Sequence, residues 1–201
     1  MYAKKNSGKK LTMVLVAIIL VMCCTIGGTL AYLTAKSDPV TNTFTVGNIT
    51  IELKEHELGA DGELTTTVTD KNTYKIIPGA TQPKDPFVTV KSGSEKCYVY
   101  VCIENQLGTN LTYDIDTADW TPVATSGNKA LYRFKTEINA ATADVTETVF
   151  TTVTYSGAIT ETTIGDLEGK KVIINAYAHQ SENITGVSVA DTEAKTHFGL
   201  N

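Results

Sequence analysis

The residues best suited to ligand chemistry in this sequence are three neighbouring aspartates. Asp114 and Asp116 flank Ile115, and Asp119 follows three residues later. Carboxylate oxygens on a loop are the hard ligands that Ca²⁺ prefers. The run lacks the Asp-x-Asp-x-Asp-Gly frame of a helical calcium loop, so an ion-binding loop and a solvated acidic loop are both open. Whether Asp114, Asp116 and Asp119 bind a metal is therefore left unassigned at this stage.

Histidine and cysteine carry no enzyme signature here. His56, His179 and His197 stand far apart, and no His-Glu-x-x-His zinc motif occurs. Cys97 and Cys102 are five residues apart, so on one strand they point to opposite faces and cannot form a good disulfide. We expect two small apolar side chains, with pairing between molecules as the alternative. No catalytic residue is predicted, and we expect neither enzyme activity nor a cofactor.

The elements that position these residues are predicted to be β-strands. The chain after residue 31 is rich in Thr, Val, Ile and Tyr, and several segments alternate apolar and polar residues. Turn clusters such as Pro78-Gly79 separate them. The predicted strands after the first are Ile49–Leu53, Leu64–Val68, Tyr74–Ile77, Phe87–Lys91, Cys97–Glu104, Leu111–Ile115, Ala130–Phe134, Thr148–Tyr155 and Lys171–Ala178.

This pattern predicts an all-β fold. Short strands with regular turns favour an antiparallel sandwich or barrel over a parallel sheet with crossover helices. Short peripheral helices are expected near Ile138–Val145 and at the C-terminus. In the second of these, Asp191 would be the N-cap, Ala194 and Phe198 would share a face, and Gly199 would end the helix.

The N-terminal segment has the layout of a secretory signal peptide. Four lysines precede an almost wholly apolar run from Leu11 to Ile26. Thr29 and Ala31 are the small residues of a cleavage site, so the mature chain would begin at Tyr32. Cleavage at this site would give a signal peptide of residues 1–31 and one domain of residues 32–201. Two alternatives stay open: an uncleaved anchor, because Leu11–Ala31 is long enough to cross a bilayer, and a lipoprotein, because Cys23 and Cys24 lie in the run.

The charge of the mature chain argues against two classes of partner. Residues 32–201 hold 13 basic and 22 acidic residues, a net charge of −9. Nucleic acid and anionic lipid both repel an acidic chain. We therefore expect no nucleic-acid partner, and contact with a membrane only transiently, through the signal peptide.

The leader and the first strand can be read together. Residues 27–34 are Gly-Gly-Thr-Leu-Ala-Tyr-Leu-Thr, followed by Asp38 and by Asn-Thr-Phe-Thr-Val-Gly-Asn-Ile at residues 42–49. This stretch resembles the opening of the TasA/camelysin family of secreted proteins of Gram-positive bacteria. The resemblance continues through residues 77–79, 84–90 and 97–101 and ends with Ile-Asn-Ala-Tyr-Ala-His-Gln at residues 174–180. Leu33 and Ala35 depart from the family, which more often has Phe and Asp there.

The resemblance implies a jelly-roll β-sandwich that is preceded by a signal helix and processed by a dedicated signal peptidase of the endoplasmic-reticulum type. For matrix-forming members it also implies self-association into biofilm fibres, in which the N-terminal segment of one subunit fills a sheet gap in the next. Phe44, Val46, Ile49 and Ile51 are the donor-strand candidates. The alternative is that this strand pairs within its own domain, which we favour for Ile49–Leu53.

Three functions follow as hypotheses. The first is a secreted structural protein at the cell surface or in the biofilm matrix. The second is a camelysin-like cell-surface metalloprotease, against which the missing zinc motif counts. The third is a surface adhesin or binding module.

Overall fold

The computed structural model describes Lys9, residues 12–18 and residues 47–200. The chain divides into two units, Met1–Thr45 and Val46–Asn201. Residues 12–18 of the first unit are helical. Within the described residues, no helix is both long enough and apolar enough to cross a membrane.

Several predicted features lie outside the described residues. They include most of the signal peptide, its cleavage residues Thr29, Ala31 and Tyr32, and the donor-strand candidates Phe44 and Val46. The signal helix and its cleavage stay predictions.

The second unit is built from antiparallel β-strands, as predicted for the fold class. Residues 47–200 hold eleven strands, one α-helix and two 3₁₀ turns. The strands are β1 (Ile51–Leu58), β2 (Leu64–Thr69), β3 (Thr81–Pro83), β4 (Phe87–Val90), β5 (Cys97–Asn105), β6 (Leu111–Tyr113), β7 (Trp120–Ser126), β8 (Lys129–Phe134), β9 (Val145–Thr148), β10 (Thr152–Tyr155) and β11 (Val172–Gln180). The other elements are η1 (Gly108–Asn110), η2 (Ile164–Leu167) and α2 (Val187–Phe198).

The strands form three sheets, with the orders β2-β1-β4-β9, β3-β10-β6 and β11-β5-β8-β7. The first two continue one another, because β3 runs on into β4 and β9 runs on into β10. The Lys84 amide donates to the Thr151 carbonyl at 2.9 Å, and the Val149 amide donates to the Pro86 carbonyl at 2.8 Å. These bonds bridge the gap, so the first two sheets make one layer that faces β11-β5-β8-β7.

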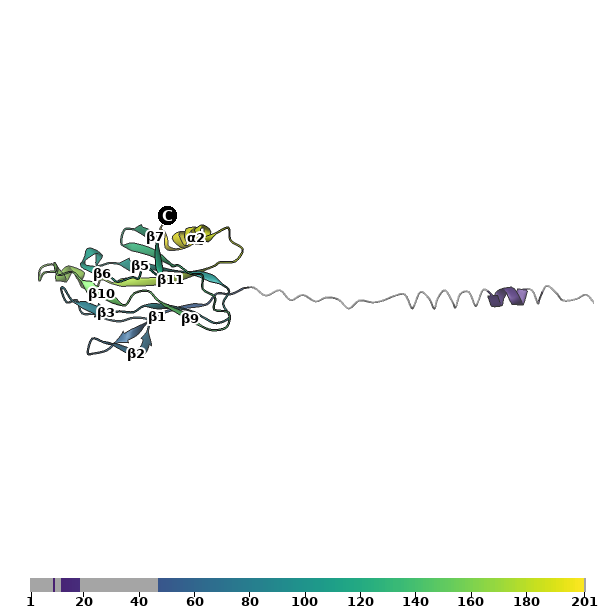
Figure 1. The fold of residues 1–201 in the computed structure, drawn as a ribbon, viewed down its shortest axis with the longest axis horizontal. Helices are drawn as coiled ribbons and strands as arrows, with labels where there is room; N and C mark the ends of the chain where they lie inside the picture. Colours follow the sequence, from purple (N-terminus) through teal and green to yellow (C-terminus); the bar gives the residue numbers. More distant parts are fainter. Residues whose placement is uncertain (1–8, 10–11, 19–46, 201) are drawn as a thin grey trace, which may run out of the picture. The chain divides into compact units, whose positions relative to one another are not determined.

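The main core lies between these layers, and β5 is its central strand. Val99, Val101 and Ile103 are fully buried in this core, together with Val88 and Val153 of the opposite layer. The alternate residues of β5 face outward, and α2 covers them (Figure 1). Because period-two alternation puts neighbours on opposite faces, both faces of β5 are closed to solvent.

The two cysteines confirm this arrangement. Cys97 lies in the main core and Cys102 in the smaller core beneath α2, and both are free. They face opposite sides of β5, as their spacing predicts.

The C-terminal helix confirms one end of the prediction and corrects the other. Gly199 ends α2 in the left-handed conformation at φ 67°, where glycine is favoured. The helix begins at Val187, so Asp191 is not its N-cap. The Asp191 carboxylate instead accepts bonds from the Arg133 guanidinium at 2.7 Å and the Tyr100 hydroxyl at 2.9 Å. Asp191 therefore lies within the helix, where its carboxylate forms an ion pair with Arg133 of the sheet.

Candidate functional site

The exposed backbone edge of β11 is the main opening in the sandwich. All nine residues of β11 pair with β5, and within the described residues no strand pairs with its other side. β1 of the opposite layer comes close, but its pairing partners are β4 and β2. Backbone N–H and C=O groups on such an edge are free to bind another chain.

A groove follows this edge between β1 and β11. Its wide end has a volume of about 890 Å³ and its narrow end about 440 Å³. Leu53 and Ile174 line both ends, so the two cavities are parts of one opening. We call it the β1–β11 groove. Its walls are Leu53–Glu55 and Val172–Ile174 at the wide end, and at the narrow end Ile51, Ala176, His197 and Phe198.

The wide end of the groove reaches the core. Leu111, Val153 and Tyr155 line the cavity, although each is under 5% exposed. Ile76 and Leu167 extend the same apolar lining. A strand laid along β11 would therefore place alternate side chains directly against the main core, where burial of apolar area is favourable.

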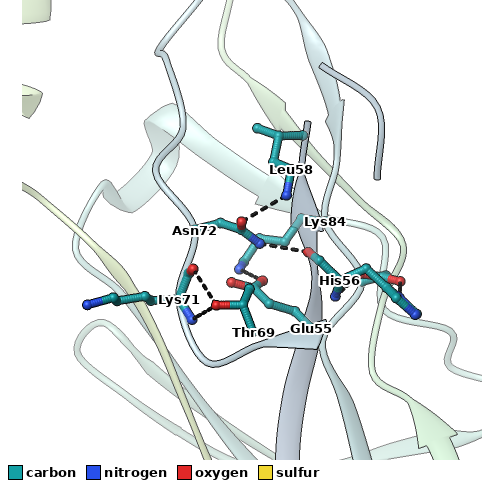
Figure 2. Close-up of polar contacts among 8 residues, drawn as sticks. Glu55, His56, Leu58, Thr69, Lys71, Asn72 and Lys84 are labelled. Atoms are coloured by element: carbon teal, nitrogen blue, oxygen red, sulfur yellow. Dashed lines mark hydrogen bonds and ion pairs between the residues drawn. The ribbon is translucent and has the colours of Figure 1, made fainter. Parts of the chain in front are cut away.

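The same cavity also has polar walls, formed by Lys54, Glu55, residues 70–74, Lys84, Glu168, Lys170 and Lys171, and a buried polar cluster lies among them. Lys84 Nζ donates to Glu55 Oε2, and both residues are buried (Figure 2). Lys84 Nζ also lies 5.1 Å from the centre of the Tyr74 ring. The Tyr74 hydroxyl oxygen is buried beside the Asn72 side chain. We call these three residues the groove cluster.

Burial shifts the titration of the tyrosine in this cluster. Desolvation, reinforced by the negative charge of Glu55, raises the pKa of the Tyr74 hydroxyl well above its usual value, and the neighbouring Asn72 side chain opposes part of this shift.

The rim beside the groove cluster is held by side chains rather than by strand pairing. The Asn72 amide donates to the His56 carbonyl at 2.8 Å and accepts from the Leu58 amide at 2.9 Å (Figure 2). His56 Nδ1 lies 2.6 Å from Asp85 Oδ2. Here the Asn72 side chain forms hydrogen bonds with the backbone groups of β1 that a paired strand would use. The predicted strand Tyr74–Ile77 does not form, and Tyr74 and Ile76 line the groove from an irregular segment.

The aspartate run does not form a metal centre in the structure. Within residues 12–18 and 47–200, no three His, Cys, Asp or Glu side chains make a group that could hold a metal ion. The Asp114 carboxylate accepts bonds from Thr151 and Thr152, the shortest at 2.6 Å. Asp116 accepts from the Ala118 amide at 2.7 Å, and the Asp119 amide donates to the Asp116 carbonyl at 3.2 Å. Asp114 and Asp116 thus bind the protein's own backbone.

Of the two described donor-strand candidates, Ile51 begins β1 and Ile49 lies two residues before it. Ile51 pairs with Val90 of β4, and Ile49 is partly buried against the main core. Both side chains therefore complete their own domain in the described structure.

The groove cluster was not identified from the sequence. Glu55, Tyr74 and Lys84 are distant in the chain and form no motif, and only the pairing of β1 with β4 brings two of them together. Alternation could have indicated that Glu55 faces inward with Leu53, because the two residues are two positions apart.

Comparison with protein-family models, with curated proteins and with solved structures finds no match for this chain.

Proposed function

We propose that this chain is a secreted structural protein, a subunit of a cell-surface or biofilm-matrix fibre of the TasA/camelysin type. The N-terminal segment of one copy adds a strand to the free edge of β11 in the next copy. The observation that carries this proposal is the nine-residue edge of β11, which has no second strand partner among residues 47–200 and lies beside a groove that opens to the core.

The strand order matches a jelly roll in part and departs from it at β1 and at β7, which pairs with β8 and not with β6. With β3/β4 and β9/β10 each counted as one strand and β2 set aside, eight strands remain. Four pairings match a jelly roll, in which two Greek keys are nested: second with seventh, seventh with fourth, eighth with third, and third with sixth. In a jelly roll the first strand lies beside the eighth. Here β1 pairs with β4 instead, so the place beside β11 is open.

The segment before the domain suits this vacancy. Val40–Val46 follows Pro39 and alternates Val, Asn, Phe and Val with threonines. Because proline cannot donate to a strand ladder, it suits the beginning of an added strand. Ile49 and Ile51 complete their own domain, so the donor strand ends before Gly47.

Assembly by this route is head-to-tail. The donor and the acceptor are different surfaces, and an interface of this kind that does not close into a ring propagates as a filament. A dedicated signal peptidase would start assembly by releasing the segment at Tyr32. The two alternative functions, a cell-surface metalloprotease and a surface adhesin, are supported by the family resemblance and by the composition of the chain.

The test is assembly of the mature chain, residues 32–201. We expect detergent-resistant fibres by electron microscopy. Removal of residues 32–46 leaves a chain that can only accept, and Ile174→Lys leaves a chain that can only donate, because a lysine in the groove opposes burial of the incoming strand. Neither variant alone should form fibres.

Mixing the two variants separates loss of assembly from loss of folding. Equimolar mixing should give a one-to-one complex and no fibre, which requires both variants to be folded. Thr125→Lys, an exposed position on β7, is the matched control and should assemble normally. A mature chain that stays monomeric at high concentration over days and across pH would contradict the proposal.

A further inference from the structure

The wide cavity of the β1–β11 groove has a local charge opposite in sign to that of the mature chain. Five of the 13 basic residues after residue 31 line it, against three of the 22 acidic residues. The five are Lys54, Lys71, Lys84, Lys170 and Lys171. We propose that this cavity binds a small amphipathic anion, a single alkyl chain with a carboxylate or phosphate head group.

Four of these five lysines keep their charge available. Lys84 forms an ion pair with Glu55 in the buried wall of the cavity. The other four form no ion pair with any carboxylate of residues 12–18 and 47–200. Figure 2 shows the Lys71 side chain extended away from the Lys84–Glu55 pair. Their charge can therefore be balanced by a ligand.

The four lysines come from three separate parts of the chain. Lys54 lies on β1, Lys71 follows β2, and Lys170 and Lys171 lie between η2 and β11. They are gathered by the fold and not by a basic run in the sequence. All except the half-buried Lys54 are exposed. An anionic head group among them would stay in contact with water, which limits the cost of removing its charge from solvent.

The buried part of the same lining is mostly apolar. Leu107, Leu111, Val153, Tyr155 and Leu167 are all buried and all line the cavity, and the one buried charged pair there is already balanced. The volume of about 890 Å³ lies within the range of small-molecule sites. An alkyl chain fits this interior because burial of its methylene groups is favourable.

An apolar interior with a cationic mouth selects the charge of the ligand. A cationic amphiphile meets like charges at the mouth, and a neutral one gains nothing from them. The net charge of −9 disfavours attachment to an anionic membrane surface. A single molecule inside the cavity instead meets the nearby lysines, because salt screens the more distant charges of the chain.

The test is calorimetry on the acceptor-only chain (residues 47–201), which contains every residue named in this cavity. The probes are dodecanoate, dodecyl phosphate, dodecanol and dodecyltrimethylammonium, each below its micelle concentration. Both anions should bind one to one, and the tighter of the two identifies the head group. The neutral and cationic probes should bind at least tenfold more weakly. Decanoate, two methylene groups shorter, should bind about tenfold more weakly than dodecanoate.

Two double variants of equal charge locate the head group. Lys170→Gln/Lys171→Gln should weaken dodecanoate binding about tenfold and leave dodecanol binding unchanged. The matched control, Lys135→Gln/Lys195→Gln, removes two lysines that do not line the cavity and should alter dodecanoate affinity less than twofold.

Bound ligand should also exclude the donor strand, because the cavity is the wide end of the groove that the strand enters. This consequence, unlike binding itself, rests on the proposed strand addition. The measurement uses the acceptor-only chain and the donor-only chain (residues 32–201 with Ile174→Lys). Saturating dodecanoate should weaken their complex at least tenfold, whereas the same concentration of dodecyltrimethylammonium should not.

Each outcome bears on a definite claim. Equal affinity for dodecanol and dodecanoate, or equal losses in the two double variants, would overturn the anion site. Dodecanoate binding that leaves the complex of the two chains unchanged would overturn the competition alone. Failure of the donor-only and acceptor-only chains to combine would overturn strand addition and leave the anion site intact.

Discussion

The two edges of the sheet β11-β5-β8-β7 differ in how they meet solvent. At the β7 edge, Pro122 removes one backbone donor and the pairing register shifts between Pro122 and Ala124. Proline and bulges are features that keep an edge strand from pairing with other chains. The β11 edge has neither feature over Val172–Gln180, and its pairing with β5 is unbroken. One edge is protected and the other is left open beside the groove.

The packing beside each edge differs in the same sense. Trp120 of β7 is fully buried, and its indole nitrogen donates to the Thr148 carbonyl of β9 at 2.8 Å. This bond ties the two layers together on the protected side. On the open side, β1 and β11 are neighbours without backbone pairing, and the side chains of Ile51, Leu53 and Ile174 are only partly buried. The sandwich is thus closed at one end of the sheet and incomplete at the other.

Of the changes that test this difference between the two edges, Lys84→Met in the wall of the groove should have the largest effect on stability. The change leaves Glu55 buried without its cation, which should lower the free energy of unfolding by about 3–5 kcal/mol. Urea denaturation of the mature chain measures this. The double variant Glu55→Met/Lys84→Met should recover most of the stability, and a double variant no more stable than Lys84→Met would show that the pair is not what holds the wall.

A smaller effect is expected at the protected edge from Trp120→Phe. The change removes the indole donor to the Thr148 carbonyl and should cost about 1–3 kcal/mol of unfolding free energy. Because Trp120 lies away from the groove, complex formation by the acceptor-only chain should be unchanged in calorimetry. Loss of affinity that exceeds the loss of stability would mean that the two edges are coupled.

Removal of the protection on β7 should produce a weak new association. Pro122→Thr restores a backbone donor at an exposed position of an edge strand. We expect the acceptor-only chain that carries Pro122→Thr to self-associate with a dissociation constant in the millimolar range. Analytical ultracentrifugation measures this, and the acceptor-only chain without the substitution should stay monomeric. Equal behaviour of the two chains would show that the bulge alone protects this edge.

The smallest effect concerns acid stability. Asp114 is partly desolvated, but its bonds from Thr151 and Thr152 outweigh that effect and lower its pKa below the usual 3.8. A folded-state pKa below the unfolded value adds stability above pH 3.8, and this is lost as the pH falls through the folded value. Asp114→Asn should therefore cost under about 1 kcal/mol at pH 7, given its exposure. The difference from the unmodified chain should shrink in urea titrations as the pH falls below 3.8.

Much of the fold could be predicted from alternation and turn residues. The predicted segments at Leu64, Phe87, Cys97, Ala130 and Lys171 correspond to β2, β4, β5, β8 and β11 within one residue of their starts. Except for the mostly exposed β2, these strands are half-buried or buried, which is a pattern that sequence can display.

Other elements were missed or wrongly assigned for physical reasons. β7 was not predicted, because Pro122 and the bulge after it break the alternation. The helix expected over Ile138–Val145 does not form, because Ile138 bridges Cys97 and Val145 begins β9. The groove itself follows from strand order, a property of the whole fold that no local pattern contains.

Hydrogen exchange at the two edges tests the central claim most directly. Amide exchange should be followed in the acceptor-only chain, alone and in complex with the donor-only chain. The account predicts that amides of Val172–Gln180 facing the groove become strongly protected in the complex, while those of Trp120–Ser126 are unchanged. Protection at β7, or a complex that leaves β11 as exchangeable as in the free chain, would contradict it.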